Sequence, residues 1–477
     1  MYDILIIGAG VVGGLIAREL SRYRLRIGIL ERMPDVAMGA TRANSAIVHA
    51  GFDAKPGTLK AKLNVRGNAM MEQVTAELGV NFCRNGSLVV GFSEEDRKTL
   101  QLLLERGIEN GVPGLSLLNR EELLALEPNI GDGVCCALLA PTGGIVCPYG
   151  LCLAAVGNAI DNGAVLNCGY EVTSIRRVGD FFEVSNGSDP LCARRVVNCA
   201  GVYSDTVARL AGDSSFTVTP RRGEYLLLDR VCGKTVSHTV FRCPSKMGKG
   251  ILVSPTVDGN LLLGPTAEDI SDRENTETTA AGLAAVRLQA GEQVKNIDFG
   301  KVITSFTGLR AVGSTGDFIL NMPFPGFVNC AGIESPGLTS SPAIAEYVVG
   351  LLREDGMETE PRDDFLPTRE PMHAFRDADP DKKNDIIRQH PEYARVICRC
   401  ETVTEGEILH AIRTEPRPTD VDGVKRRTRA TMGRCQGGFC TPHIVELLAR
   451  ENGIPPENVT KCGGASRILA GKTKGGC

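Results

Sequence analysis

The sequence of 477 residues contains no tryptophan, only six histidines and few aromatic residues of any kind. A net formal charge of −4 excludes the strongly basic surface of a general nucleic-acid-binding protein. The most apolar stretch, Ile4–Ala17, is interrupted by four glycines and is shorter than the roughly 18 residues that a membrane span needs. No basic region precedes it, so a secretory signal peptide is not expected either. These absences favour a cytoplasmic protein without a transmembrane segment.

Cysteine, by contrast, is abundant, with 17 residues between Cys83 and Cys477. An odd number scattered through a long chain is not the pattern of a small secreted disulfide scaffold. We expect reduced thiols, most of them small buried apolar residues and some of them metal ligands. The chain length and a hydrophobic content of 42% predict a sizeable core that is divided into two or three domains.

The N-terminal residues follow the pattern of a dinucleotide site. An apolar strand over Asp3–Ile7 leads into a helix that ends near Tyr23, and a second strand, Arg26–Leu30, ends in Glu31. The turn between the first strand and the helix holds three spaced glycines, Gly8, Gly10 and Gly13. Glycines let the backbone approach a pyrophosphate, and the helix N-terminus supplies N–H donors to it. The Glu31 carboxylate suits an adenosine ribose and disfavours a 2'-phosphate, so the pattern predicts FAD or NAD rather than NADP.

Three later segments favour FAD. The segment Thr41–Gly51 (TRANSAIVHAG) resembles the second flavin-contacting segment of the D-amino-acid-oxidase-like FAD-dependent oxidoreductases. The segments Val196–Gly201 and Gly326–Gly332 each read as a strand that ends in small residues, and they resemble the later FAD-contacting turns of that family. The resemblance covers residues 1–352 and implies a bound FAD.

A helix is predicted directly after the last of these segments. We expect it over Ala343–Leu352, with Ser341 as its N-cap and Pro342 at its first helical position. In the family this helix directs its N-terminus at the pyrimidine end of the flavin, where reduction builds up negative charge.

The same resemblance implies an α/β fold, in which a Rossmann-type FAD-binding domain is interleaved with an α+β mixed-sheet substrate domain. The FAD-binding parts are expected at about 1–74, 150–214 and 311–352, and the substrate parts at about 75–149 and 215–310. Alternating apolar runs predict strands in the substrate parts, with a hairpin turn at Asn260. The implied cofactor-binding residues are Gly8, Gly10, Gly13, Glu31, Arg32, Thr41, Asn44, Ser45, Val172, Ala200, Gly201, Gly332, Gly337, Leu338 and Thr339.

Three residues are candidates for the catalytic site. Oxidation of an alcohol needs a base for the hydroxyl proton, and His49 is the one histidine inside a flavin-adjacent motif. Arg310 falls where the family places an arginine over the flavin face, and a guanidinium binds a carboxylate or phosphate well. Lys249 resembles the lysine of single-chain glycerol-3-phosphate oxidases, with Lys246 as its neighbour. Alternatively, these residues are a core histidine, an internal salt bridge and a solvated lysine.

The composition changes after the predicted core. Residues 353–395 are rich in charge and predict a surface linker, residues 396–452 form a cysteine-containing domain, and residues 453–477 form a glycine-rich tail. Helices are predicted near Glu405–Arg413 and Pro442–Glu451.

Four cysteines in this domain form two pairs, Cys398 with Cys400 and Cys435 with Cys440. The first spacing fits structural zinc poorly, and the pattern resembles the bacterioferritin-associated-ferredoxin-like [2Fe-2S] domains. That resemblance implies four cysteine ligands to a [2Fe-2S] cluster. A basic run, Lys425–Arg434, is expected to offset the negative charge of the cluster. A zinc site with His443 and a nucleic-acid-binding patch stay as alternatives.

Together, these features resemble the catalytic subunits of the anaerobic glycerol-3-phosphate dehydrogenases. The resemblance implies oxidation of sn-glycerol 3-phosphate, with His49 receiving the hydroxyl proton and with Arg310 and Lys249 holding the anionic substrate. Electrons would then pass through the cluster to an acceptor protein, such as a second flavoprotein subunit, that could also attach the enzyme to a membrane. The alternatives are an L-2-hydroxyglutarate dehydrogenase-like enzyme, an amino-acid dehydrogenase and a non-catalytic electron-transfer subunit.

Overall fold

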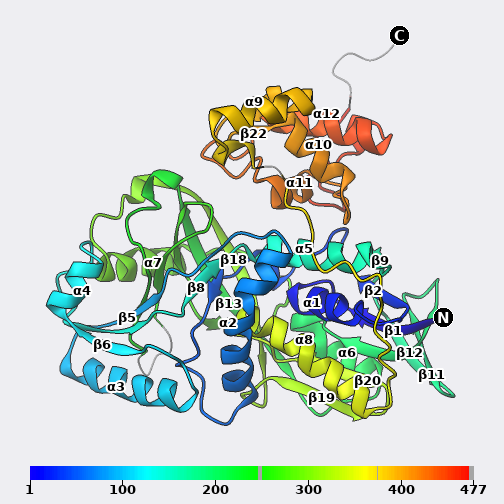
Figure 1. Cartoon of the computed structure of the whole chain (residues 1–477), viewed down its shortest axis with the longest axis horizontal. Coiled ribbons are helices and arrows are strands. Elements are labelled where there is room, and N and C mark those ends of the chain that lie inside the picture. The colour runs from blue at the N-terminus through cyan, green and yellow to red at the C-terminus, as the bar shows by residue number, and fades with distance from the viewer. Residues whose placement is uncertain (245–249, 373, 472–477) are drawn as a thin grey trace.

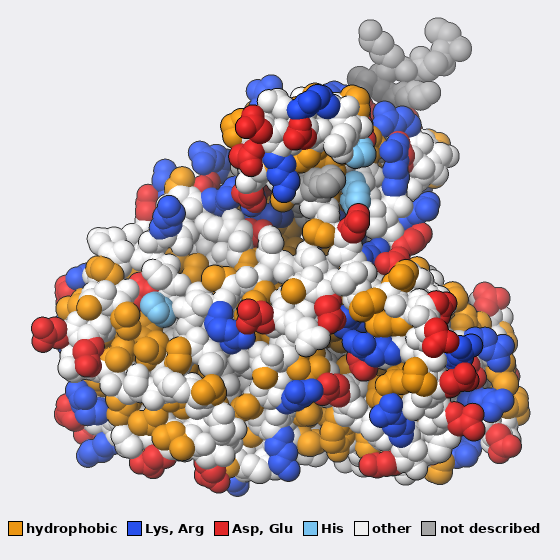
Figure 2. All heavy atoms as spheres, viewed as in Figure 1, with side chains coloured by type: hydrophobic (Ala, Val, Ile, Leu, Met, Phe, Trp, Pro, Cys, Tyr) orange, Lys and Arg blue, Asp and Glu red, His pale blue; other side chains and the backbone are white. Residues whose placement is uncertain are grey.

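The computed structural model describes residues 1–244, 250–372 and 374–471, and it consists of three parts (Figure 1). Two parts are each built on a large sheet and lie side by side. The third is a small helical lobe, residues 375–471, which we call the C-terminal lobe. In the space-filling view it stands on top of the wider body as a separate lobe, and charges of both signs are scattered over this face (Figure 2).

The first sheet has eight strands in the order β10-β11-β12-β1-β2-β9, with β20 beside β12 and β19 beside β20. Side chains of β1 alternate between two cores, with Ile4 and Ile6 on one face and Leu5 and Ile7 on the other. A strand that is buried on both faces reads as one continuous apolar run, as the sequence predicted. The strands are β1 (Tyr2–Ile7), β2 (Ile27–Glu31), β9 (Val165–Cys168), β10 (Ser174–Val178), β11 (Phe181–Ser185), β12 (Leu191–Asn198), β19 (Ile319–Phe324) and β20 (Phe327–Ala331).

Helices cover both faces of this sheet. On one face α1 packs against α5 and α8, and on the other face α6 contributes Val207 to the core. Their bounds are α1 (Val11–Leu20), α5 (Pro148–Asp161), α6 (Ser204–Leu210) and α8 (Gly337–Glu354).

The second sheet has nine strands, in the order β17-β13-β16-β15-β14-β5-β7-β6, with β18 also paired to β13. It is mixed, because β5 and β14 run parallel while the other pairs are antiparallel. The predicted hairpin at Asn260 is confirmed between β15 and β16, where Thr256 N–H donates to the Asn260 carbonyl. The strands are β5 (Ser87–Gly91), β6 (Ser116–Asn119), β7 (Cys136–Ala140), β13 (Val218–Leu228), β14 (Thr239–Arg242), β15 (Leu252–Pro255), β16 (Leu261–Gly264), β17 (Glu268–Asp269) and β18 (Val302–Gly313).

Three helices, α3 (Glu94–Glu109), α4 (Arg120–Leu126) and α7 (Ala280–Gln293), lie with the second sheet (Figure 1). Between the two large parts run α2 (Leu59–Glu77) and a small sheet of β3 (Ile47–Val48), β4 (Phe82–Cys83) and β8 (Gly144–Val146). The first sheet is parallel at its centre and antiparallel at β10–β11–β12 and at β19–β20. This architecture confirms the predicted α/β fold class, in which a Rossmann-type domain is combined with a mixed-sheet domain and a small C-terminal helical domain.

Helix α8 begins earlier than the sequence predicted. We expected a start at Ala343 with Ser341 as N-cap, but the helix begins at Gly337 and Pro342 lies inside it. Proline lacks the N–H that would bond the carbonyl of Leu338 four residues before it. The Ser341 hydroxyl donates to that carbonyl instead, at 2.7 Å, so the helix continues through the proline.

The charged segment after α8 divides into two halves. Residues up to about 371 run along the first sheet's helices, where Arg24 N–H donates to the Glu360 carbonyl and Arg369 N–H to the Glu77 carbonyl. The second half, predicted as linker too, is folded into the C-terminal lobe. There Phe375, Ile386 and Tyr393 form a small buried cluster, which periodicity in so polar a segment did not reveal.

The rest of the C-terminal lobe encloses its own apolar core. The helix predicted near Glu405–Arg413 is confirmed, and α11 was not predicted. The elements are α9 (Pro380–Gln389), β21 (Val396–Cys398), β22 (Val403–Thr404), α10 (Glu405–Arg413), α11 (Val421–Thr428) and α12 (Thr441–Asn452). In the part of the chain that the structure describes, no helix is both long and apolar enough to cross a membrane.

Candidate functional site

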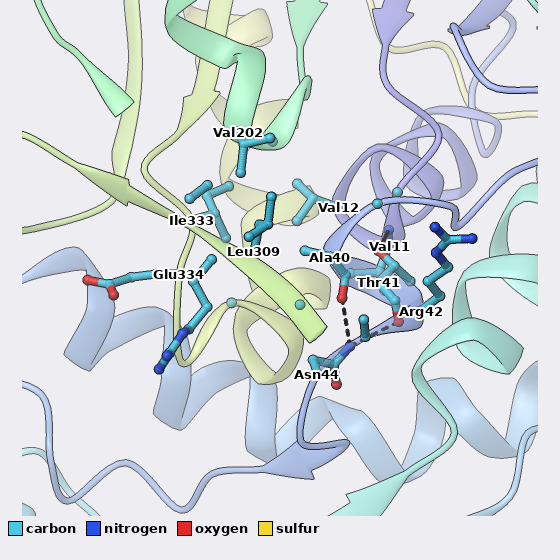
Figure 3. A pocket seen from close by; sticks show the side chains of 18 of the residues that line it. Val11, Val12, Ala40, Thr41, Arg42, Asn44, Val202, Leu309, Ile333 and Glu334 are labelled. Atoms are coloured by element: carbon cyan, nitrogen blue, oxygen red, sulfur yellow. Dashed lines mark hydrogen bonds between the residues drawn. The ribbon is translucent and has the colours of Figure 1, made fainter. Parts of the chain in front are cut away.

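A cavity of about 480 Å³ lies between the two large parts and receives the ends of several strands. Figure 3 shows Val11, Thr41 and Arg42 at one end, and Leu309, Ile333 and Glu334 at the other. The first end belongs to the β1–α1 turn and to the short helix η1 (Ala40–Arg42), and the second to β18 and the loop before α8. The cavity is therefore elongated, with the predicted dinucleotide motif at one end and the predicted catalytic residues at the other.

The β1–α1 turn requires its glycines for close backbone packing. Gly8 has φ +107°, and a Cβ there would lie 2.4 Å from the carbonyl oxygen of Cys199. A Cβ on Gly13 would lie 2.0 Å from the carbonyl oxygen of Gly8. Without these side chains the N-terminus of α1 opens directly to the cavity, where its N–H groups suit an anion. Thr41 Oγ1 already accepts from the Val11 N–H at 3.0 Å and fixes η1 beside it.

The Glu31 carboxylate lies at the end of β2, as the sequence predicted. It accepts from the N–H groups of Ala9 and Met33, both at 2.9 Å, and burial raises its pKa. Its neighbour Arg32 stacks over the ring of Tyr203 at 4.2 Å and pairs with Glu274 at 2.7 Å. Carboxylate and stacked ring together form the end of the cavity that suits an adenosine.

Most residues that the family resemblance implied for FAD binding face this one cavity. Those that line it are Gly8, Gly10, Glu31, Arg32, Thr41, Asn44, Ser45, Val172, Ala200, Gly201, Gly337 and Leu338. Three others lie behind its wall: Gly13 packs on Gly8, Gly332 packs on Gly313, and Thr339 accepts the backbone N–H of His49 at 2.8 Å. For these three the geometry indicates support of the wall, while direct cofactor contact stays a prediction.

His49 lines the other end of the cavity and is held on several sides. Its carbonyl accepts from the side-chain amides of Asn64 at 2.8 Å and Asn68 at 3.0 Å. Its ring Nε2 lies 3.2 Å from the Ser335 hydroxyl, and the ring centre lies 5.8 Å from that of Phe241. A histidine whose backbone and ring are both positioned in this way is suited to proton transfer at a fixed place.

Arg310 on β18 also lines the cavity, and its contacts leave it available for an anion. Its guanidinium donates to the carbonyls of Thr266 at 2.6 Å and Arg222 at 3.4 Å, and its buried Nε has no hydrogen-bond partner. Among the described residues no carboxylate forms an ion pair with it. Desolvation by burial lowers the pKa of Arg310, and the positive charge of Arg221 lowers it further.

Two residues at the end of the cavity that holds His49 and Arg310 were not predicted from the sequence. The buried Tyr225 stacks on Phe306 at 4.7 Å between ring centres, and its hydroxyl lies 3.1 Å from Ser45 Oγ. Ser335 lies beside His49, as described above. Each contact joins segments far apart in sequence, so no local pattern pointed to it. The predicted Lys249 and its neighbour Lys246 lie outside the described residues.

The C-terminal lobe brings the four predicted cysteine ligands together as two pairs. A hydrogen bond with Cys440 lowers the pKa of Cys398 to about 6, and the pKa of Cys440 is raised in return. Although desolvation opposes it, interaction with Cys400 and with backbone N–H groups lowers the pKa of Cys435. Cys398 and Cys440 are buried, whereas Cys400 and Cys435 are partly exposed. Four thiols in two pairs fit a binuclear cluster, in which each iron takes two protein ligands.

No group of three or more His, Cys, Asp and Glu side chains in the described chain is arranged to hold a single metal ion. On the first turns of α12, His443 Nδ1 lies 3.6 Å from a carboxylate oxygen of Glu446. Of the tail cysteines, Cys462 contacts the Ser466 hydroxyl at 3.5 Å, and Cys477 lies outside the described residues.

The basic run beside the cysteines forms ion pairs that the sequence did not predict. Arg426 and Arg427 pair with Asp35, Arg429 pairs with Asp258 at 2.7 Å, and Arg434 pairs with Asp229 at 3.1 Å. All three carboxylates belong to the body, so these arginines hold the C-terminal lobe to it. Each of these four side chains has a carboxylate partner, and the expected offset of a cluster's negative charge stays a prediction.

Comparison with known proteins gives two family matches and several relatives. Residues 3–351 match the model of the FAD dependent oxidoreductases, and residues 396–450 match that of the BFD-like [2Fe-2S] binding domains. The chain is 45% identical over 476 residues to a glycerol 3-phosphate dehydrogenase of Caloramator mitchellensis, covering 99% of each chain. It is 33% identical over 363 residues to a glycerol 3-phosphate oxidase of Mycoplasma pneumoniae, covering 73% of this chain and 94% of the relative.

Among solved structures, the dithionite-reduced L-alpha-glycerophosphate oxidase of M. pneumoniae with FAD bound matches with a TM-score of 0.73 and 31% identity. The match covers 77% of this chain and 98% of the oxidase. A glycerol-3-phosphate dehydrogenase from Bacillus halodurans, complexed with FAD, matches with a TM-score of 0.68 over 95% of this chain and 91% of its own. At 17% identity the latter match shows the fold alone.

Proposed function

Because the chain belongs to the FAD-dependent oxidoreductase family and carries a BFD-like [2Fe-2S] binding domain, we propose that it is a glycerol-3-phosphate dehydrogenase. It oxidises the secondary alcohol of sn-glycerol 3-phosphate to the ketone of dihydroxyacetone phosphate and delivers the electrons to a separate acceptor protein. The two family matches confirm the predicted cofactors, FAD and a [2Fe-2S] cluster. The observation that carries the proposed substrate is the 45% identity, over nearly both full lengths, to a protein named for this activity.

The cavity supports an anionic alcohol as substrate. Arg310 presents a guanidinium without a carboxylate partner among the described residues, beside the apolar side chains of Leu309 and Ile333. A phosphate or carboxylate bound to Arg310 would form charge-assisted hydrogen bonds that offset the hydration lost on burial. Binding of the anion there fixes one end of the substrate, so that its hydroxyl carbon lies at a defined place in the cavity. Lys249 remains a proposed second cation.

His49 is the proposed base. FAD, when bound, supplies the hydride acceptor, and the protein must accept the proton that leaves the substrate hydroxyl. The Ser335 hydroxyl holds Nε2, and the backbone of His49 is held by Thr339 and Asn64. We assign the proton to the His49 ring because no other histidine lines the described cavity.

The C-terminal lobe provides the proposed route for electrons. The cluster, when bound to Cys398, Cys400, Cys435 and Cys440, supplies a carrier that accepts one electron at a time. The loop between α11 and Cys435 reaches the body, where the Tyr149 hydroxyl contacts the Met432 sulfur at 3.6 Å. A plain oxidase passes electrons to oxygen and needs no such lobe. We therefore propose a cytoplasmic dehydrogenase with a protein acceptor, such as a second flavoprotein subunit.

A second candidate is a 2-hydroxy acid dehydrogenase. The chain is 31% identical over 381 residues to the mitochondrial L-2-hydroxyglutarate dehydrogenase of Pongo abelii, covering 74% of this chain and 88% of the relative. The observation that favours it is Arg310 itself, since a guanidinium binds a carboxylate as readily as a phosphate.

Anaerobic mixing of the purified protein with each substrate separates the candidates. We expect sn-glycerol 3-phosphate to remove the visible absorbance of the bound flavin within one turnover, and L-2-hydroxyglutarate and common amino acids to leave it unchanged. If L-2-hydroxyglutarate alone bleaches the flavin, the proposed substrate is wrong and the 2-hydroxy acid dehydrogenase takes its place. If no candidate bleaches the flavin, the catalytic assignment fails and a non-catalytic electron-transfer role takes its place.

A further inference from the structure

Residues 33–42, which we call the bridging segment, lie between the cavity and the C-terminal lobe. Their inner side faces the cavity through Met33, Met38, Gly39, Ala40, Thr41 and Arg42. Their outer side meets the C-terminal lobe, where Asp35 pairs with two arginines of α11. Next to it Pro34 packs so closely on the tail that a Cβ on Gly463 would lie 2.4 Å from its ring. One short segment therefore touches both the cofactor site and the lobe that carries the cysteines.

The outer contact is buried and geometrically demanding. Asp35 is 2% exposed and takes two bonds from Arg427, at 2.8 and 2.9 Å, and one from Arg426 at 2.5 Å. The α11 backbone approaches so closely that a Cβ on Gly423 would lie 3.1 Å from Asp35 Oδ2. A buried ion pair tolerates little displacement, because a shift leaves a charge without water or partner. The position of the bridging segment and that of α11 are thus set together.

The inner contact ends in Arg42. Thr41 ties η1 to the N-terminus of α1, and Figure 3 shows Arg42 beside Val11 at that end of the cavity. Within the described chain the Arg42 guanidinium makes no side-chain hydrogen bond or ion pair. Desolvation and the positive charge of Arg426 lower the pKa of Arg42. Arg42 therefore lies next to a helix N-terminus and is repelled by Arg426. An anion bound in the cavity beside Arg42 would stabilise both the guanidinium and the helix N-terminus.

We propose that Arg42 binds the diphosphate of FAD and that the bridging segment makes FAD binding and docking of the C-terminal lobe mutually stabilising. FAD neutralises Arg42 and orders η1, and the ordered segment presents Asp35 to α11. Conversely, the docked α11 holds the segment in the position that receives the diphosphate. Such coupling is reciprocal, because each event changes the free energy of the other by the same amount. It does not depend on which alcohol the enzyme oxidises.

The diphosphate contact is tested by titrating the full-length, cluster-containing protein after removal of its FAD. We expect Arg42→Ala to lower the affinity for FAD and for ADP by roughly tenfold or more, because a charge-assisted hydrogen bond to the diphosphate is lost. Arg42→Lys should recover part of the affinity. The matched control is Lys62→Ala, which removes an exposed cation of α2 that does not line the cavity and should leave both affinities unchanged. Unchanged FAD and ADP affinity in Arg42→Ala would overturn this assignment.

The coupling is tested by hydrogen–deuterium exchange of the same protein with and without FAD, in the absence of substrate. In the wild-type protein we expect FAD to slow amide exchange in α11, whose Arg426 lies 391 positions along the chain from Asp35. In Arg426→Ala, FAD should still slow exchange in α1 but no longer in α11, and FAD affinity should fall several-fold. If FAD leaves exchange in the wild-type α11 unchanged, the coupling is wrong, even where the variants are too unstable to compare. Failure of the proposed substrate would change neither readout.

Discussion

At the scale of single residues, Arg310 is the side chain whose removal distinguishes substrate binding from cofactor binding. Its contacts are backbone carbonyls, so Arg310→Ala removes no buried carboxylate partner in the described chain. We expect kcat/KM for sn-glycerol 3-phosphate to fall roughly a hundredfold, because charge-assisted hydrogen bonds contribute about 1.5–3 kcal/mol each. The FAD content should stay at the wild-type level. Steady-state kinetics and the flavin-to-protein ratio measure both effects.

The matched control for that experiment is Arg287→Ala, which removes an arginine of α7 whose contact is the Phe299 carbonyl outside the cavity. It should leave kcat/KM unchanged. Loss of FAD from Arg310→Ala, rather than loss of substrate binding, would show that Arg310 supports the cofactor instead.

The residues of the cavity differ in how far the sequence could predict them. Glu31 and His49 belong to short motifs whose spacing is set by local geometry, and both line the cavity. Tyr225 and Ser335 carry no such pattern. The hydroxyl of Tyr225 meets Ser45 across 180 positions of the chain, and Ser335 meets His49 across 286. Contacts of this kind arise from tertiary packing, and a single sequence contains no local signal for them.

At the scale of elements, the second half of the charged segment is a part of the C-terminal lobe and not a tether. The ring of Tyr393 lies over the backbone of α10, where a Cβ on Gly406 would be 2.0 Å from it. We expect Tyr393→Ala to destabilise the C-terminal lobe by about 3 kcal/mol, since it leaves a cavity beside Phe375. Loss of the visible iron–sulfur absorption on heating should occur at a lower temperature, while release of FAD should be less affected.

Leu366 provides the control for this prediction. It lies in the first half of the segment and is 55% exposed, so Leu366→Ala should change neither transition measurably. Equal effects of the two substitutions would contradict the division of residues 353–395 into a surface half and a folded half.

Helix boundaries were predicted well where capping signals are unambiguous and poorly where two signals compete. For α10, Thr404 and Glu407 form a reciprocal capping box, and the predicted bounds agree with the structure. For α8, Pro342 predicted a start at its own position, but the Ser341 hydroxyl replaces the missing hydrogen bond. Helix α11 was overlooked because its basic residues suggested a charged surface, whereas its arginines are paired with the body.

At the scale of the whole molecule, those ion pairs determine how the C-terminal lobe is held. The sequence contained the basic run but could not reveal its partners, because Asp35, Asp229 and Asp258 come from three separate segments of the body. Burial would raise the pKa of Asp35, yet the bonds from Arg427 and Arg426 outweigh it and lower that pKa below its usual 3.8. A carboxyl whose pKa is lowered by folding stabilises the protein above its unfolded pKa, and this contribution is lost as the pH falls through the folded pKa.

We therefore expect Asp35→Asn to destabilise the docked lobe by about 3 kcal/mol at neutral pH, the usual cost of breaking a buried ion pair. The difference from the wild-type protein should stay constant down to about pH 5 and shrink below about pH 4, where the Asp35 carboxyl of the unfolded chain takes up a proton while that of the folded protein stays ionised to lower pH. Thermal unfolding of both proteins, measured across this pH range, shows whether the stability difference shrinks on acidification. The control, Asp363→Asn, removes a carboxylate whose side chain is 95% exposed and should show no such effect. A difference that grew on acidification would contradict the assignment.

If the body oxidises the substrate and the C-terminal lobe only carries electrons away, substitution of a cluster ligand should affect the second step alone. Cys435 lies in the partly exposed thiol pair with Cys400, away from the FAD cavity. Cys435→Ser should abolish the EPR signal of the reduced cluster, because serine is a poor ligand to a soft iron–sulfur centre. Substrate should still bleach the flavin at the wild-type rate in anaerobic single-turnover mixing, since Arg310 and His49 are untouched. Steady-state turnover with a protein electron acceptor should fall strongly, while Cys462→Ser, in the tail, should leave both activities and the EPR signal intact. If Cys435→Ser retained full turnover, electrons would leave the flavin directly, and the lobe would have a structural role only.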